Sequence, residues 1–212
     1  MQRRHFSHTA AALIATTALG WMAAGTAHAA ATVGQPAPDF ALQDTSGKTV
    51  RLSDFKGKHV VLEWTNPGCP FVRKHYESGN MPATQKDATS KGVVWLAINS
   101  TEKASGDYLE PAALAAWKQK HQAAPTAVLL DAEGTTGRAY GARTTPHMYI
   151  INPEGKLVYA GAIDSIASAR AADIPKATNY IQQALAQALA GKPLTVATTA
   201  PYGCSIKYKS AG

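Results

Sequence analysis

His59 to Tyr76 reads H-V-V-L-E-W-T-N-P-G-C-P-F-V-R-K-H-Y, and this stretch holds the clearest secondary-structure signals in a chain of 212 residues. Its first part, Val60 to Trp64, is an apolar and partly β-branched run with the length of a buried strand. Asn66-Pro67-Gly68 then supplies turn residues. Pro70 suits the first position of a helix, because proline has no N–H to leave unpaired and its φ is already helical. We therefore predict a strand, a turn and a helix in direct succession.

Cys69 lies between the predicted turn and the predicted helix, which we expect to end near Gly79. A sulfur at the start of a helix faces unpaired backbone N–H groups and the positive end of the helix dipole, and both favour the thiolate over the thiol. Because the thiolate is the nucleophilic form of cysteine, the position predicts a reactive Cys69. The alternative interpretation is a buried free thiol that behaves as a small apolar side chain.

The segment V-V-L-E-W-T-N-P-G-C resembles the active-site strand and turn of the thioredoxin superfamily, and within it the redoxin branch that includes the alkyl hydroperoxide reductase/thiol-specific antioxidant (AhpC/TSA) family. The resemblance gives Cys69 the place of the attacking cysteine of the C-x-x-C motif, while Val72 stands where the second cysteine would be. The peroxiredoxin signature P-x-x-x-T-x-x-C is absent as well, because Leu62 and Asn66 occupy its proline and threonine positions. The segment is most similar to a peroxiredoxin-like subgroup that keeps one cysteine here.

The order of strand and helix patterns predicts a single α/β domain with a thioredoxin-like fold, in which helices flank a central mixed β-sheet. We expect it to span residues 30–212, from an N-terminal β-hairpin to a C-terminal tail that carries Cys204. Strands of the sheet are expected at Val60, Val93, Thr126, Met148 and Leu157, and helices at residues 71–76, 81–90, 111–122 and 177–190. The A-P-D-F and G-K-x-V-x-L patterns near the start also resemble the beginning of redoxins.

A second mark of the family lies between residues 139 and 161, where a Thr-Pro pair enters a strand and an Asn-Pro-Glu-Gly turn leads into the next strand. Thioredoxin-fold proteins place a cis-proline at this point, facing the active cysteine. The resemblance gives that role to Pro146, with Thr145 before it. Composition alone would favour a trans bond, because only about 5% of X-Pro bonds are cis.

Glu63 stands in the strand at the position where thioredoxins hold a buried acid that moves protons for the dithiol. Among apolar neighbours its carboxylate would be desolvated and its pKa raised, which suits a general acid or base. The alternative is that Glu63 faces solvent or pairs with Lys58 or Arg73. Arg73 and Arg143 are candidates to stabilise the thiolate. The remaining residues expected around the site are Trp64, Thr65, Asn66, Pro67, Gly68, Pro70, Thr145 and Pro146.

Cys204 follows the last predicted helix in the stretch P-Y-G-C-S-I-K-Y. A tail of this kind can bring a second thiol to a cysteine that lacks a local partner, so we predict that Cys204 is a resolving cysteine or a disulfide partner of Cys69. In the oxidised form their Cα atoms would then lie roughly 4.4 to 6.8 Å apart. An unpaired Cys204 is the alternative.

The N-terminal 29 residues have the pattern of a signal peptide, with Arg3-Arg4, a small-residue apolar stretch from Ala11 to Ala24, and an A-x-A pattern at Ala27-His28-Ala29. The paired arginines fit either a twin-arginine or an ordinary Sec signal. We expect an exported protein, in the periplasm of a bacterium, with no stable membrane insertion after cleavage. Loss of the two arginines lowers the formal charge from +7 to +5, and the scattered basic residues predict no nucleic-acid partner.

These observations predict an exported thiol-disulfide oxidoreductase or antioxidant redoxin, with protein thiols, protein disulfides or peroxides as substrates. It would need an external reductant and no cofactor. One alternative is a peroxide-reducing, peroxiredoxin-like enzyme that uses the same two cysteines. Another is a copper-binding or metal-transfer module with Cys69, His75 and His147 as ligands, although the usual C-x-x-x-C is absent. A permanent structural crosslink between the cysteines is the third.

Overall fold

The computed structural model describes residues 30–210, so the predicted signal peptide lies outside the described residues. The strands are β1 (Ala41–Asp44), β2 (Thr49–Arg51), β3 (Val60–Trp64), β4 (Val94–Asn99), β5 (Ala127–Leu130), β6 (Thr144–Thr145), β7 (His147–Ile151), β8 (Leu157–Gly161) and β9 (Cys204–Ser205). The helices are α1 (Pro70–Glu77), α2 (Asn80–Ser90), α3 (Pro111–Lys120), α4 (Thr135–Tyr140) and α5 (Tyr180–Leu189), with 3-10 turns η1 (Leu52–Phe55) and η2 (Ala171–Lys176).

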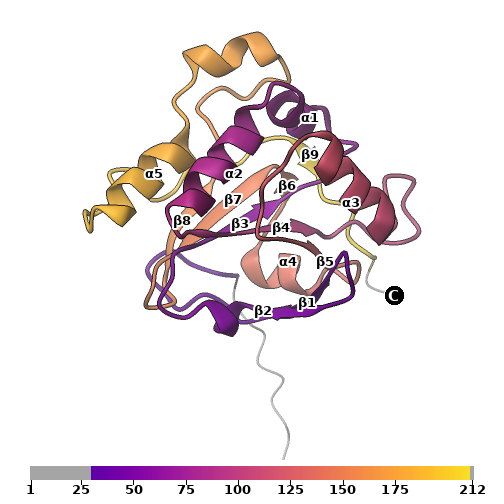
Figure 1. Ribbon diagram of the computed structural model, residues 1–212, viewed down its shortest axis with the longest axis horizontal. Helices are drawn as coiled ribbons and strands as arrows, with labels where there is room; N and C mark the ends of the chain where they lie inside the picture. The colour runs from indigo at the N-terminus through magenta and orange to yellow at the C-terminus, as the bar shows by residue number, and fades with distance from the viewer. Residues whose placement is uncertain (1–29, 211–212) are drawn as a thin grey trace, which may run out of the picture.

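Seven strands form one mixed sheet in the order β2-β1-β5-β4-β3-β7-β8 (Figure 1). The central neighbours β3, β4 and β5 are parallel, whereas β7 pairs antiparallel with β3 and the β1–β2 hairpin pairs antiparallel with β5. The predicted thioredoxin-like α/β fold is therefore confirmed, with the cysteine-bearing segment on the central strand of the sheet. β3 is buried on both faces, as its near-continuous apolar sequence predicts for a central strand.

Alternating residues of β3 face two separate hydrophobic cores. Val60, Leu62 and Trp64 pack with α4 and the N-terminal hairpin on one face of the sheet. Val61 packs on the other face, where α1, α2 and α5 supply the apolar side chains. Figure 1 shows α1, α2 and α3 above the sheet and α4 below it. Glu63 lies in β3 between Leu62 and Trp64. Because side chains alternate along a strand, it shares a face with Val61 and points to the core under α1 and α2.

Several boundaries differ from the sequence prediction for local reasons. The last helix begins at Tyr180 rather than near Ala177, because the Asn179 side chain accepts hydrogen bonds from the Ile181 and Gln182 N–H groups and caps the helix. The short helix α4 was not predicted at all. It contains Gly137 and has no apolar repeat of helical period, so nothing in its local sequence marks it.

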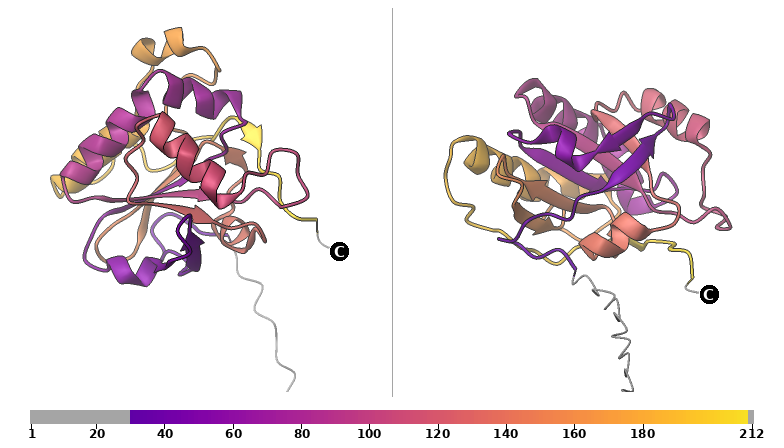
Figure 2. Two further views of the ribbon diagram at one scale, coloured as in Figure 1. Left: turned by 45° about the vertical axis from the view of Figure 1, so that its right-hand side comes forward. Right: turned by 90° about the horizontal axis from the view of Figure 1, so that it is seen from below.

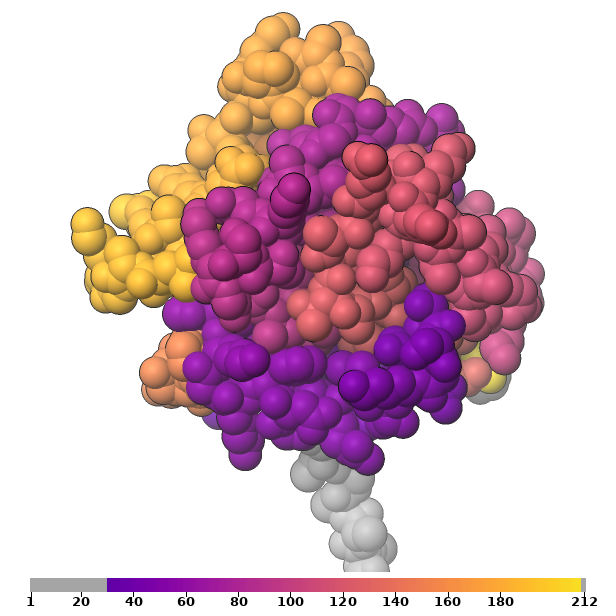
Figure 3. All heavy atoms as spheres, viewed as in Figure 1, coloured from indigo at the N-terminus to yellow at the C-terminus, as the bar shows by residue number. Residues whose placement is uncertain are grey.

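The C-terminal tail returns to the carboxyl end of β3 and pairs there with the segment before Pro146. β9 is antiparallel to β6, and Cys204 lies opposite Thr145. Beyond it, the Ile206 N–H donates to the Arg143 carbonyl at 3.0 Å, and the Tyr208 hydroxyl donates to the Ala142 carbonyl at 2.8 Å. In the two views of Figure 2 the yellow tail follows the side of the domain. In the same view as Figure 1, Figure 3 shows the orange segment around η2 projecting beyond the helices at the top of the molecule.

Candidate active site

Local hydrogen bonds place Cys69 at the start of α1. The Asn66 side-chain oxygen accepts from the Gly68 N–H at 2.7 Å, and the Asn66 carbonyl accepts from the Cys69 N–H at 3.0 Å. These two bonds close the turn after β3. Cys69 is the N-cap residue, with extended backbone angles, and Pro70 is the first residue of the helix. The predicted strand–turn–helix is confirmed.

Cys69 and Cys204 form a disulfide, with Cα atoms 5.9 Å apart. That distance lies inside the range expected for a disulfide, so the predicted pairing is confirmed. The bond joins residues 135 positions apart, and Cys69 is only 3% exposed beneath the tail. In the oxidised form Cys69 is therefore covered by its own partner.

Thr145 and Pro146 lie against both cysteines. Their peptide bond is cis, as the resemblance implied. The Thr145 carbonyl oxygen lies 3.1 Å from the Cys69 sulfur, within hydrogen-bond reach of a reduced thiol. On its other side Thr145 pairs with Cys204 in the β6–β9 ladder. One backbone segment thus touches the two ends of the disulfide.

Glu63 is fully buried and its carboxylate accepts three hydrogen bonds. The donors are the Tyr76 hydroxyl at 2.7 Å, the Trp95 indole N–H at 2.8 Å and the Gln85 amide at 2.9 Å. Burial raises the pKa of Glu63, while these donors act against the rise. The same burial and the Glu63 charge hold the pKa of Tyr76 well above its usual value. Neither Lys58 nor Arg73 pairs with Glu63, and Arg73 instead forms an exposed ion pair with Glu77 at 2.9 Å.

A polar cleft of about 240 Å³ opens beside the disulfide. The loop after β4 forms one wall with Ser100, Thr101 and Asp107, and the tail forms another. Thr65 lines this cleft and also a small apolar space beside Tyr76. Within residues 30–210, its hydroxyl is the one buried side-chain polar atom with no partner in hydrogen-bond geometry, although it lies close enough to Glu63 to lower the pKa of that carboxyl.

Other predicted shell residues have mainly structural contacts. The Trp64 indole N–H donates to the Ser100 hydroxyl at 3.0 Å, and the Asn66 amide donates to Thr101 at 2.9 Å, which ties the loop after β4 to β3. Pro67 is buried beneath the turn. The Arg143 side chain is exposed, and its positive charge lowers the pKa of the neighbouring His147 after the larger effect of burial.

The three candidate metal ligands are not brought together. In the part of the chain that the structure describes, no group of three or more His, Cys, Asp or Glu side chains could hold a metal ion. Cys69 is bonded to Cys204, and His147 Nδ1 accepts from the Arg143 N–H at 3.3 Å. His75 lies in a different buried cluster. Burial lowers the pKa of His147 to about 3, so it is a neutral, hydrogen-bonded core residue near pH 7.

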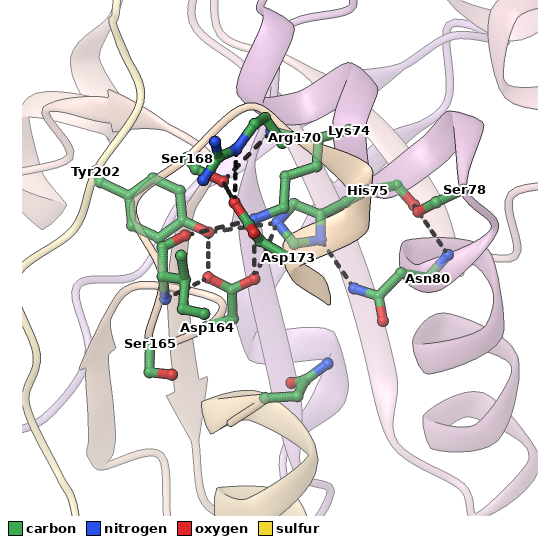
Figure 4. Close-up of polar contacts among 12 residues, drawn as sticks. Lys74, His75, Ser78, Asn80, Asp164, Ser165, Ser168, Arg170, Asp173 and Tyr202 are labelled. Carbon is green, nitrogen blue, oxygen red and sulfur yellow. Dashed lines mark hydrogen bonds and ion pairs between the residues drawn. The ribbon is translucent and has the colours of Figure 1, made fainter. Parts of the chain in front are cut away.

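Sequence reasoning missed that buried cluster, which is drawn in Figure 4. Lys74 forms an ion pair with Asp164 at 3.1 Å, and both side chains are nearly inaccessible. His75 and Tyr202 complete it. Lys74 and His75 look like ordinary basic residues in the last turn of a helix, and Asp164 is remote in sequence, so no local pattern joins them.

Comparison with known proteins now assigns the family. The sequence model of the AhpC/TSA family matches residues 33–160, a range that includes Glu63, Cys69 and Pro146. The chain belongs to that family. The thiol-disulfide oxidoreductase ResA of Bacillus subtilis is 32% identical over 162 residues, which cover 74% of this chain and 84% of ResA.

Two solved structures extend the similarity over most of the domain. An uncharacterized conserved protein from Geobacillus kaustophilus has a TM-score of 0.73 and 28% identity, over 85% of this chain and 94% of that protein. A hypothetical protein from Sinorhizobium meliloti 1021 has a TM-score of 0.70 and 25% identity, over 86% and 98%. Residues 30–210 contain no helix with the length and apolar character needed to cross a membrane.

Proposed function

We propose that this chain is an exported thiol-disulfide oxidoreductase in which Cys69 is the nucleophile and Cys204 the resolving cysteine. The observation that carries the proposal is the disulfide between a helix N-cap cysteine and a tail cysteine, held beside the cis Thr145–Pro146 bond. Homology to ResA, a thiol-disulfide oxidoreductase, supports the reaction class. The N-terminal pattern supports export, and a mature chain that begins at Ala30 by mass spectrometry would test it.

The reaction proceeds in two exchanges. In the reduced protein, the Cys69 thiolate attacks one sulfur of a substrate protein disulfide, so that one Cys69–substrate bond forms and one substrate thiolate leaves. The Cys204 thiolate then attacks Cys69, releases the second substrate thiolate and leaves the Cys69–Cys204 disulfide. Two electrons pass to the substrate, whose two thiolates take up the two protons that the cysteines released. An external dithiol returns the enzyme to its reduced form.

The surroundings of Cys69 favour the thiolate that this scheme needs. Its sulfur lies at the N-terminus of α1, whose free N–H groups and dipole stabilise negative charge. Glu63 is the proposed proton carrier, because its raised pKa lets it hold a proton nearer to neutral pH than an exposed glutamate does. Thr65 lines both the space beside Tyr76 and the cleft at Cys69, so its unpaired hydroxyl is suited to pass that proton.

Single cysteine variants test the scheme. We expect Cys204→Ser to accumulate a mixed disulfide between Cys69 and a protein disulfide substrate, because the resolving thiolate is gone. Cys69→Ser should form no adduct and lose activity by at least about 1,000-fold, the scale seen when a catalytic nucleophile is removed. Non-reducing gel electrophoresis and mass spectrometry measure both. A Cys204→Ser protein that turns over substrate at the native rate would contradict the resolving role.

The same variants distinguish the peroxide-reducing alternative. In that case Cys69 would pass through a sulfenic acid, and Cys204→Ser would trap that sulfenic acid after hydrogen peroxide is added. A dimedone adduct on Cys69, formed at a rate that competes with disulfide exchange, would favour peroxide as the substrate.

A further inference from the structure

The last turn of α1 carries a buried polar group that receives the C-terminal tail. We call Lys74, His75 and Asp164 the tail seat. Lys74 Nζ donates to Asp164 Oδ2 at 3.1 Å, and the Ile166 N–H donates to Asp164 Oδ1 at 3.1 Å. His75 Nδ1 lies 2.8 Å from the Asn80 amide nitrogen, so it accepts from Asn80 and its Nε2 carries the proton. None of these bonds involves the tail, so the tail seat is formed by the body of the domain.

Tyr202 is the tail residue that occupies the tail seat (Figure 4). Its hydroxyl donates to Asp164 Oδ1, and His75 Nε2 lies 3.4 Å from the hydroxyl oxygen. Its ring packs edge-on against Phe71, with centroids 5.8 Å apart, and Lys74 Nζ lies 5.7 Å from the ring centroid. Both the polar and the apolar parts of the tyrosine are therefore bound, and the seat would recognise no aliphatic residue in the same way.

Two residues of the tail seat, Lys74 and His75, lie on α1, the helix that begins at Cys69. Lys74 is five residues after Cys69 in α1, about 7.5 Å along the helix axis. Tyr202 precedes Cys204 by two residues, and two extended residues span about 7 Å. A tyrosine held at the seat thus brings Cys204 back to the level of Cys69. Gly203 between them lets the chain pass Thr145 closely, because a Cβ there would overlap the Thr145 carbonyl oxygen.

We propose that Tyr202 is a positioning residue that keeps Cys204 beside Cys69 when the disulfide is open. The proposal rests on the proposed function, in that the two cysteines must cycle between dithiol and disulfide. Docking of Tyr202 raises the effective concentration of the Cys204 thiol at Cys69. The two equilibria are coupled. Docking of Tyr202 favours disulfide formation by a certain factor, and the disulfide favours docking of Tyr202 by the same factor.

The equilibrium with glutathione measures this factor. Two glutathione thiols reduce the Cys69–Cys204 bond, which takes up two electrons and two protons and yields the dithiol and one glutathione disulfide. We expect Tyr202→Phe, which keeps the ring and removes the hydroxyl, to favour the dithiol by about tenfold, a rise of about 30 mV in the reduction potential. Tyr208→Phe is the matched control, because its hydroxyl bonds a neutral carbonyl on the other side of Cys204. It should change the equilibrium less than threefold.

A shift in Tyr202→Phe no larger than that in Tyr208→Phe would overturn the proposal. A double-mutant cycle identifies the route of the effect. If Tyr202 acts through Asp164, the equilibrium of Tyr202→Phe/Asp164→Ala should equal that of Asp164→Ala alone, because alanine leaves no acceptor for the Tyr202 hydroxyl, and full additivity would contradict it. Should Asp164→Ala fail to fold, the hydrogen exchange rate of the Ile206 amide in reduced Tyr202→Phe serves instead. Faster exchange than in reduced Tyr208→Phe is expected, and equal rates would count against the seat.

The equilibrium needs no protein substrate, so its failure is distinguishable from failure of the proposed function. A Cys69–Cys204 couple that shifts as expected but reduces no substrate protein would leave the tail seat in place and remove the oxidoreductase proposal. If substrate turnover is normal but Tyr202→Phe leaves the Cys69–Cys204 equilibrium unchanged, the oxidoreductase proposal stands and the positioning role of Tyr202 is removed.

Discussion

Glu63 is subject to two opposing effects that decide its protonation. Complete burial favours the neutral acid, whereas three donors arranged around its oxygens favour the carboxylate. Burial is the larger effect, so the pKa lies above the usual value. A carboxyl group so placed keeps its proton to a higher pH than an exposed glutamate does, and it bonds Tyr76 of the helix that begins at Cys69.

We expect Glu63→Gln to slow the reaction of reduced Cys69 with iodoacetamide and to flatten its pH profile. The amide cannot titrate, and it presents an NH₂ group to at least one of three donors, which should cost about 1–3 kcal/mol of stability. A raised carboxyl pKa also means that the folded protein holds this proton longer than the unfolded chain, so native stability falls as pH rises above about 4.5. The free energy of unfolding of the native protein should therefore exceed that of Glu63→Gln by less and less as the pH rises above about 4.5.

Asp131→Asn is the control for this prediction. Asp131 is a second buried carboxylate with a raised pKa, and it binds Ser100 and the start of α4 rather than Tyr76. Its replacement should reduce stability without removing the inflection in the alkylation profile. A profile for Glu63→Gln that keeps the native inflection would make Glu63 a structural residue.

The elements that the sequence predicted are those whose signal is local. β3 and α1 follow from an apolar run, turn residues and a proline at the helix start, and the β7–β8 hairpin follows from its Asn-Pro-Glu-Gly turn. The β6–β9 pair was expected only as a tail that brings Cys204 to Cys69. The polar partners of Tyr202 could not be predicted, because Lys74 and Tyr202 come together only after the fold has placed Asp164 between them.

Gly203 tests the importance of the β6–β9 pair. It has φ of +127°, and a Cβ at this position would overlap the Thr145 carbonyl oxygen. We expect Gly203→Ala to lift the tail from β6, to destabilise the oxidised protein by more than about 3 kcal/mol and to make the disulfide easier to reduce. Chemical unfolding and the glutathione equilibrium measure these effects.

Gly191→Ala is the matched control for Gly203. Gly191 also has a positive φ, +65°, but no atom lies within 4 Å of the position of an added Cβ. Backbone conformation alone should cost about 1–2 kcal/mol there, with no change in the redox equilibrium. Equal effects of the two substitutions would show that close packing of the tail against Thr145 is unimportant.

On the scale of the whole molecule, the disulfide closes a loop of 135 residues and joins the tail to Cys69 in the central strand–helix unit. Such a crosslink acts mainly on the unfolded chain, whose entropy it lowers by the equivalent of about 5 kcal/mol. The folded protein depends on it less, because Tyr202, Ile206 and Tyr208 each bond to the body of the domain. We infer that the disulfide can open without unfolding the domain.

We therefore expect reduction to lower the free energy of unfolding by up to about 5 kcal/mol while the native fold persists. Urea unfolding with and without reductant measures the change, and the denaturant dependence should be steeper for the reduced chain, because it exposes more surface when it unfolds without a crosslink. The double variant Cys69→Ser/Cys204→Ser should resemble the reduced protein within about 1 kcal/mol, since both lack the bond and keep the tail seat. If reduction alone unfolded the domain at neutral pH, the tail contacts would be too weak to hold Cys204 in place, and the disulfide would be a structural crosslink rather than a working redox pair.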